Sequence, residues 1–261
     1  MPSIAGHEVL AETVGSGSPA VMIHAMLARH SALMPLAGAL PFRTTLFDLP
    51  GHGGSGKWDG QREYQALTAD IAAHFCDGPT HLIGHSFGGT AALRLAVTRP
   101  DLVNRLTLIE PVYFAAARGT QAHADHARAF RPFITAMLAG KEARAAQIFN
   151  DLWSGTRWSD LSPRRQADLT ARIYLVVASA AAIEEDADGI VSPEQLGVLD
   201  IPVTLIRGAD SPDVVRSIHE VLTHRINGAT DHVVDGAGHM LPMTHADQVA
   251  KIIRATATET D

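Results

Sequence analysis

The sequence contains almost no cysteine, since Cys76 is the only one among 261 residues. A single thiol cannot form a disulfide within the chain, so the fold does not depend on oxidation. Cys76 lies near a predicted helix end with no reactive motif around it. We interpret it as a buried or neutral residue rather than a catalytic thiol.

Clusters of positive charge and long apolar runs are also missing. The 21 Lys and Arg residues stand against 28 Asp and Glu residues, and no basic run interrupts this acidic balance. A nucleic-acid partner is not expected, because nucleic-acid grooves need clustered positive charge. No apolar stretch reaches the roughly 18 residues of a membrane span, and the first residues do not form a signal peptide. We therefore expect a cytoplasmic protein whose partner is a small-molecule substrate, with no membrane partner.

Short apolar runs rich in Val, Ile and Leu recur along the chain and end in glycine, proline or polar turn residues. They cover residues 20–24, 44–49, 81–84, 106–109, 203–206 and 232–234. Such continuous runs are typical of strands buried on both faces of a parallel sheet. Helical patterns at 64–75 and 87–98 separate some of them. The sequence therefore predicts an α/β fold with a doubly wound, mostly parallel sheet.

The alternation of strand and helix stops between residues 114 and 196. The pattern there is helical, at 126–138, 141–153 and 164–182. A helical block between two core strands predicts an insertion over the carboxyl edge of the sheet, where open α/β sheets bind ligands. We expect a core domain of residues 1–113 and 197–261 and a helical lid subdomain of residues 114–196. The alternative is a packing layer that does not contact substrate.

The segment from Gly84 to Gly88 reads Gly-His-Ser-Phe-Gly and matches the G-x-S-x-G pattern. An apolar run precedes Ser86 and a helical pattern follows it, which is the context of a nucleophile elbow. The two glycines leave room for the strand and the helix to approach each other. The serine hydroxyl would then lie at the positive end of a helix dipole. Ser86 is therefore the predicted nucleophile.

A serine nucleophile needs an imidazole base and donors for the developing oxyanion. Among 14 histidines, His239 is placed to be the base, because it follows the last predicted strand in a glycine-containing loop. The oxyanion hole takes one backbone N–H from the residue after the nucleophile and one from the loop after an earlier strand. Phe87 and Met26 occupy these positions.

Other motifs in the sequence do not point to a cofactor or a metal. Residues 51–56 fit G-x-G-x-x-G, but a loop sequence follows instead of the helix that would hold a pyrophosphate. His219 and His224 are one residue too far apart for a metal-binding H-E-x-x-H pair on one helix face. The histidines at 24, 52 and 85 are interpreted as cleft walls or structural hydrogen-bonding residues. We expect no cofactor and no metal.

Together these segments resemble the α/β-hydrolase superfamily. The family's Asp-x-Pro-Gly-x-Gly-x-Ser loop is present as residues 48–55, and the usual His-Gly after the first parallel strand is His24-Ala25 here. The resemblance implies a serine hydrolase that works through an acyl-enzyme. It also places the acid of the triad after the strand at 203–206, where Asp210 is the predicted acid and Asp213 an alternative. Some relatives similar to haloalkane dehalogenases use a carboxylate after the preceding core strand, and Glu110 occupies that position.

Carboxylic esters are the expected substrates, because they are the commonest and easiest target for this apparatus. Large side chains of the helical segment predict a pocket for a small to medium hydrophobic acyl or aryl group: Trp153, Trp158, Met137, Phe130 and Phe133. Hydrolysis of a carbon–carbon bond is the first alternative on the same triad, followed by lactone, amide and peracid chemistry. A receptor-like protein that binds a ligand without turnover is the alternative from another class.

Overall fold

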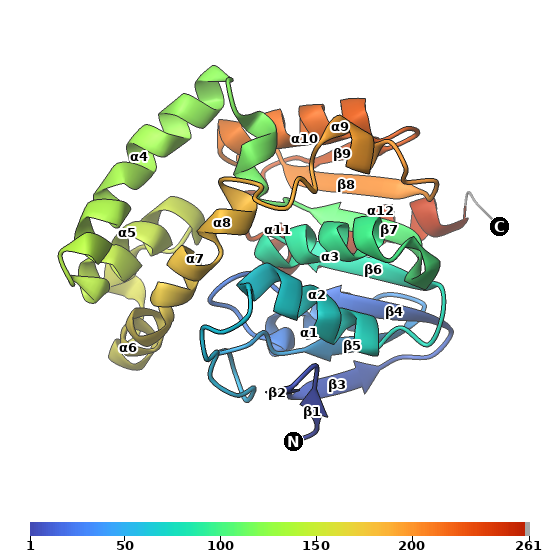
Figure 1. Cartoon of the computed structure of the whole chain (residues 1–261), viewed down its shortest axis with the longest axis horizontal. Helices are drawn as coiled ribbons and strands as arrows, with labels where there is room; N and C mark the ends of the chain where they lie inside the picture. Colours follow the sequence, from blue (N-terminus) through green and yellow to red (C-terminus); the bar gives the residue numbers. More distant parts are fainter. Residues whose placement is uncertain (259–261) are drawn as a thin grey trace.

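A seven-stranded sheet forms the centre of the computed structural model, which describes residues 1–258. The strand order is β3-β5-β4-β6-β7-β8-β9, with β3 antiparallel to β5 and all other neighbours parallel (Figure 1). The strands are β3 (Ala11–Val14), β4 (Ser18–Ile23), β5 (Phe42–Phe47), β6 (Thr80–His85), β7 (Val103–Ile109), β8 (Val203–Gly208) and β9 (Thr230–Val234). A separate two-stranded sheet holds β1 (Ser3–Ile4) and β2 (His7–Glu8).

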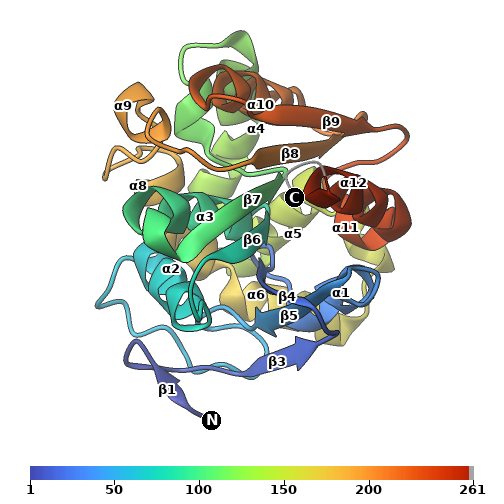
Figure 2. The same ribbon diagram turned by 90° about the vertical axis from the view of Figure 1, so that its right-hand side faces the viewer.

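Helices cover both faces of the sheet, as Figure 2 shows in a view from its end. One face carries α2 (Tyr64–His74), α3 (Phe87–Thr98) and α10 (Asp213–Arg225), and the other carries α1 (Met34–Gly38), α11 (Leu241–Thr244) and α12 (Ala246–Thr258). Two short 3₁₀ helices, η1 (His30–Leu33) and η2 (Pro100–Leu102), complete the core. Along β8, Leu205 packs into the core on the first face and Ile206 into the core on the second. Burial of alternate residues on opposite faces explains why the strands are apolar without interruption.

The chain between β7 and β8 is helical or irregular from Phe114 to Leu196, and we call this segment the helical block. Its larger helices pack around a core of their own that includes Phe133, Leu169 and Ile173. They lie together at one end of the sheet, on the left of Figure 1. Its elements are η3 (Phe114–Ala117), α4 (Gln121–Leu138), α5 (Glu142–Trp153), η4 (Trp158–Asp160), α6 (Pro163–Arg172), α7 (Tyr174–Ala178), α8 (Ala180–Ile183) and α9 (Pro193–Leu196).

The predicted doubly wound, mostly parallel α/β fold is confirmed, and all predicted apolar runs overlap strands. The structure also contains β1, β2 and β3, which the sequence pattern did not indicate. β3 is a short edge strand with two exposed residues, Glu12 and Thr13, so it has no apolar run to detect. The single helix predicted over residues 164–182 is divided into α6, α7 and α8. None of the helices among residues 1–258 combines the length and apolar character that crossing a membrane requires.

Four of the buried histidines outside the helical block resist protonation. Burial lowers the pKa of His24 to about 4 and the pKa values of His52, His81 and His85 to about 3, from an ordinary value of 6.5. Each ring makes at least one hydrogen bond in its neutral form, such as the one between His81 Nε2 and Thr107 Oγ1 at 2.8 Å. The folded state therefore excludes protons that the unfolded chain takes up in mild acid.

We expect the free energy of unfolding to fall as the pH is lowered from about 6.5 toward about 4. Above this window the histidines are neutral in both states, and within it only the unfolded state binds protons. Each such histidine contributes a slope of up to about 1.4 kcal/mol per pH unit. Urea unfolding measured at pH 7, 6, 5 and 4 checks the sign and the slope. The His81→Gln variant has one titrating group fewer and should show a shallower slope, and an unchanged slope would contradict the role of His81.

Candidate active site

The carboxyl ends of three neighbouring strands meet at one edge of the sheet, and the backbone is strained at each of them. Leu27, Ser86 and Glu110 follow β4, β6 and β7, and their φ angles are 61°, 56° and 48°. Residues with a side chain rarely adopt this left-handed region, and clusters of such residues occur at functional sites. The strain therefore marks this edge of the sheet as the candidate active site.

Ser86 lies in a sharp turn between β6 and α3. Its backbone N–H donates to the carbonyl oxygen of Ile109 at 2.9 Å, and the residue is the N-cap of α3. The glycines on either side are required sterically. A Cβ on Gly84 would lie 2.3 Å from the carbonyl oxygen of Gly88, and a Cβ on Gly88 would lie 2.3 Å from the carbonyl oxygen of Ile23. The G-x-S-x-G pattern thus follows from the close crossing of strand and helix.

His239 lies between a hydroxyl and a carboxylate. Its Nε2 is 2.9 Å from Ser86 Oγ, and its Nδ1 is 2.6 Å from Glu110 Oε2. All three residues are buried. Since an ionised carboxylate only accepts hydrogen bonds, Nδ1 carries the proton and Nε2 is free to accept from the serine. This arrangement can move a proton from the serine hydroxyl to the imidazole while the carboxylate stabilises the resulting cation.

Glu110 is held ionised by several donors although its side chain has no exposed surface. Its Oε1 accepts the backbone N–H of Gly208 at 2.7 Å and the hydroxyl of Ser211. Burial by itself would raise the pKa of Glu110, but the contacts with His239 and with these two donors bring it below its ordinary value. The carboxylate beside His239 is therefore negatively charged at neutral pH.

Glu110, and not Asp210, is the carboxylate beside His239, which corrects the sequence prediction. Asp210 is exposed, and its backbone N–H bonds to the carbonyl oxygen of Ala237. Asp213, the other alternative, is in the first turn of α10 and pairs with Arg216 at 3.1 Å. The last residue of β8 and the loop after it donate hydrogen bonds to Glu110, but they do not provide the carboxylate.

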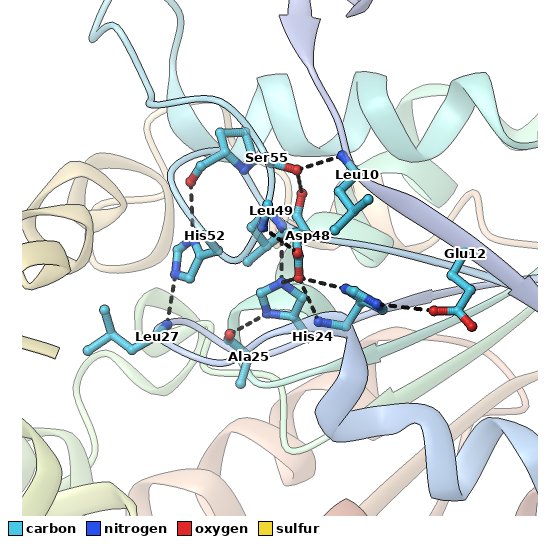
Figure 3. Close-up of polar contacts among 12 residues, drawn as sticks. Leu10, Glu12, His24, Ala25, Leu27, Asp48, Leu49, His52 and Ser55 are labelled. Carbon is cyan, nitrogen blue, oxygen red and sulfur yellow. Dashed lines mark hydrogen bonds and ion pairs between the residues drawn. The ribbon is translucent and has the colours of Figure 1, made fainter. Parts of the chain in front are cut away.

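Two neutral histidines fix the loop that carries Met26. His24 accepts the backbone N–H of Leu49 at 3.0 Å and donates to the carbonyl oxygen of Ala25 at 2.8 Å. His52 accepts the backbone N–H of Leu27 at 2.9 Å. Figure 3 shows both rings between the loop after β4 and the loop after β5. The interpretation of these two residues as hydrogen-bonding residues agrees with this geometry, and their low pKa values keep both rings uncharged.

The predicted oxyanion donors lie beside the nucleophile. Met26 and Phe87 line the same cavity as Ser86. Among the backbone hydrogen bonds of residues 1–258, none uses the N–H of Met26 or of Phe87 as donor. Both residues thus lie at the cavity with no acceptor for their N–H groups among these bonds, and their role as oxyanion donors stays a prediction. His85 adds a further contact, because its Nε2 donates to the carbonyl oxygen of His239 at 2.9 Å. The sequence indicated a structural role for His85, but not its partner.

A cavity of about 320 Å³ opens over Ser86 and His239, and residues of the helical block form most of its wall. Trp153 lines it and lies against the ring of His239, with ring centres 4.6 Å apart. Phe130 and Phe133 line it as well. Met137 and Trp158 do not line this cavity but pack against the core of the helical block, which corrects their prediction as substrate-binding residues.

Comparisons with known proteins agree with this architecture. The profile of the Alpha/beta hydrolase family matches residues 20–252. Lipase LipV of Mycobacterium tuberculosis is 30% identical, with 88% of this chain and 85% of that protein covered. Esterase YbfF of Escherichia coli is 26% identical, with 94% of each chain covered. A solved structure of a thermophilic esterase from Thermogutta terrifontis superposes with a TM-score of 0.74 and 23% identity, over 97% of this chain and 94% of that one.

The buried contact between His52 and Leu27 gives a prediction about stability. His52→Leu leaves the N–H of Leu27 without an acceptor, which should lower the free energy of unfolding by about 1–3 kcal/mol. Tyr64→Phe is the matched control, since it removes a hydroxyl that donates to the carbonyl oxygen of Pro50 but leaves the acceptor of Leu27 in place. Urea unfolding at pH 7.5 compares the two. A larger loss in Tyr64→Phe than in His52→Leu would contradict the assigned role of His52.

Proposed function

Because this chain belongs to the alpha/beta hydrolase family, we propose that it hydrolyses carboxylic esters through a covalent acyl-enzyme formed on Ser86. The observation that carries the proposal is the continuous hydrogen-bonded path from Ser86 through His239 to Glu110. LipV and YbfF are a lipase and an esterase by name, and this favours ester chemistry over other reactions of the same triad.

The first half of the proposed reaction transfers the acyl group to the enzyme. His239 Nε2 takes the proton of Ser86 Oγ as this oxygen attacks the ester carbonyl carbon. The carbonyl π electrons move to the oxygen, which becomes an oxyanion within reach of the N–H groups of Met26 and Phe87. When the oxyanion collapses, the C–O bond to the alcohol breaks, and the alcohol leaves with the proton held by His239.

The second half repeats these steps with water. His239 takes a proton from a water molecule, whose oxygen attacks the acyl carbon. The bond to Ser86 Oγ breaks, the proton returns to Ser86, and the carboxylic acid is released. Glu110 keeps Nδ1 protonated throughout and stabilises the imidazolium in both halves. The ring of Trp153 packs beside the imidazole, with ring centres 4.6 Å apart and ring planes tilted by 59°.

The cavity supports a small to medium hydrophobic group in the substrate. Its wall is mainly apolar and aromatic, and its volume of about 320 Å³ is at the small end of the usual range for ligand sites. Since α4, α5, α7 and α8 contribute to this wall, we propose that the helical block is the lid of the site. In this role it excludes water from the acyl-enzyme and sets the length of chain that fits.

Replacement of the nucleophile tests the proposal. Ser86→Ala should abolish hydrolysis of p-nitrophenyl esters with acyl chains of two to eight carbons, and its melting temperature should stay close to that of the wild type. A fluorophosphonate should label the wild-type protein at Ser86, as located by peptide mass spectrometry, and should not label the variant. Labelling at another residue, or turnover by Ser86→Ala near the wild-type rate, would refute the assignment. A wild-type protein that binds these esters without turnover would favour the receptor alternative.

Replacement of the acid separates Glu110 from Asp210. Glu110→Gln presents an amide N–H₂ to Nδ1, which forces the imidazole into the tautomer that cannot accept from Ser86. A loss in kcat on the order of 10⁴ is expected, as in other triads with this change. Asp210→Asn is the matched control, because the exposed carboxylate lies away from His239, and its kcat should stay within about twofold of the wild type. Thermal melts verify that both variants are folded. A large loss of kcat in Asp210→Asn with little change in Glu110→Gln would identify Asp210 as the acid.

A further inference from the structure

Beyond Ser86 and His239, the polar side chains of the cavity fall into two groups. The cavity is lined by His126, Asn150, Ser154, Arg165, Ser179 and Glu184. The first group already has partners: the hydroxyls of Ser154 and Ser179 donate to backbone carbonyls, and Arg165 pairs with Asp168 and donates to the carbonyl oxygen of Leu27. His126, Asn150 and Glu184 form the second group, and their free polar atoms define what a substrate meets.

Asn150 offers an acceptor to the cavity. Its Nδ2 donates to the carbonyl oxygen of Thr156 at 2.8 Å and to Asp151 Oδ1 at 3.3 Å, which uses both hydrogens and fixes the orientation of the amide. Its Oδ1 accepts no hydrogen bond from residues 1–258, although the residue is only 5% exposed. An acceptor at the cavity wall without a protein donor is satisfied by a donor from a ligand or from water. Asn150 lies one helical turn before Trp153, the residue against His239.

Glu184 adds negative charge to the same cavity. Within residues 1–258 its carboxylate forms no hydrogen bond or ion pair, whereas its backbone carbonyl accepts from Arg118 Nη2 at 2.7 Å. Burial raises the pKa of Glu184 to about 7, and the charge of Arg118 offsets part of this effect. At pH 8 the carboxylate is therefore mainly ionised and acts only as an acceptor.

Glu184 has no ion-pair partner among the described residues, although the charge of Arg118 acts on it. Burial lowers the pKa of His126 to about 4, so its ring is neutral, and the ring lies among those of Phe114, Phe130 and Trp153. Its Nε2 is enclosed there without a partner. The cation on the cavity wall, Arg165, shares Asp168 with Arg29 and Arg172 and donates to the carbonyl oxygen of Leu27. A carboxylate in the substrate would thus enter an apolar cavity in which Glu184 repels it and the guanidinium of Arg165 is already bonded.

We propose that Asn150 and Glu184 select esters that carry a hydrogen-bond donor, a hydroxyl or an ammonium group, at the end remote from the ester bond, and that they reject esters with a free carboxylate there. The inference rests on the proposed ester hydrolysis and specifies its substrate class. A donor satisfies acceptors that an alkyl chain leaves unpaired, which is a stronger basis for discrimination than the size of an apolar group. A carboxylate loses its hydration and is repelled by the like charge of Glu184.

The test uses esters that differ only at the remote end. p-Nitrophenyl esters with acyl chains of four, six and eight carbons end in methyl, hydroxyl, ammonium or carboxylate groups. A second series of acetate esters has the same groups on the alcohol chain. At pH 8 we expect, at one chain length at least, kcat/KM for the hydroxyl and ammonium esters to exceed that for the carboxylate ester about tenfold or more. The hydroxyl ester should also exceed the alkyl ester.

Two variants that keep the branching of the original side chain assign the preference to its residues. Glu184→Gln should reduce the ammonium-to-carboxylate ratio of kcat/KM about tenfold, and Asn150→Leu should bring the hydroxyl-to-alkyl ratio down toward one. Glu185→Gln is the matched control, since Glu185 carries the same charge next in the chain but is exposed and lies outside the cavity wall. Its ratios should equal those of the wild type.

The outcomes separate the inference from the function on which it rests. Ser86-dependent hydrolysis of the alkyl esters with ratios near one in both series, or with a preference for the carboxylate ester, would overturn the inference and leave ester hydrolysis intact. A loss of preference in Glu185→Gln equal to that in Glu184→Gln would also overturn it. Absence of hydrolysis of every ester by the wild type would refute the proposed function itself.

Discussion

The buried carboxylate of Glu110 is the interaction on which the rest of the site depends. It follows β7, receives hydrogen bonds from the loop after β8, and bonds to a histidine in the loop after β9. Residues at the carboxyl ends of three consecutive strands therefore meet at one buried negative charge. A buried carboxylate without such partners would be protonated, and it would then neither orient the imidazole nor stabilise its cation. The left-handed backbone at Glu110 is a local cost of bringing the side chain to this point.

Much of the fold could be predicted, because its strongest features are local in sequence. Strands buried on both faces leave continuous apolar runs, and the crossing of β6 and α3 leaves room only for glycine at 84 and 88. His239 was identifiable because it follows a strand and lies in a glycine-containing loop. The acid was not identifiable, because Asp210 and Glu110 both follow core strands. Only the direction of the loop after β8, which turns into α10 at Pro212, distinguishes them.

The wall of the cavity shows what a helical pattern cannot predict. Phe133 and Met137 are one turn apart on α4, yet only Phe133 lines the cavity. Periodicity identifies the apolar face of a helix but not the part of that face which packs within the helical block and the part which meets a ligand. The free amide oxygen of Asn150 could not be predicted either, since it depends on the two acceptors that hold the other side of the amide.

The contact between Trp153 and His239 limits how the protein can diversify. An insertion that only covered the site could be exchanged between relatives as an independent module, with changes in specificity alone. Here the insertion provides the surface against which the imidazole lies, at 4.6 Å between ring centres. A replacement block has to bring a planar side chain to the same position, or the histidine loses packing on one side. Under the proposed function, specificity and turnover are therefore coupled in this chain, because the helical block that lines the cavity also packs against His239.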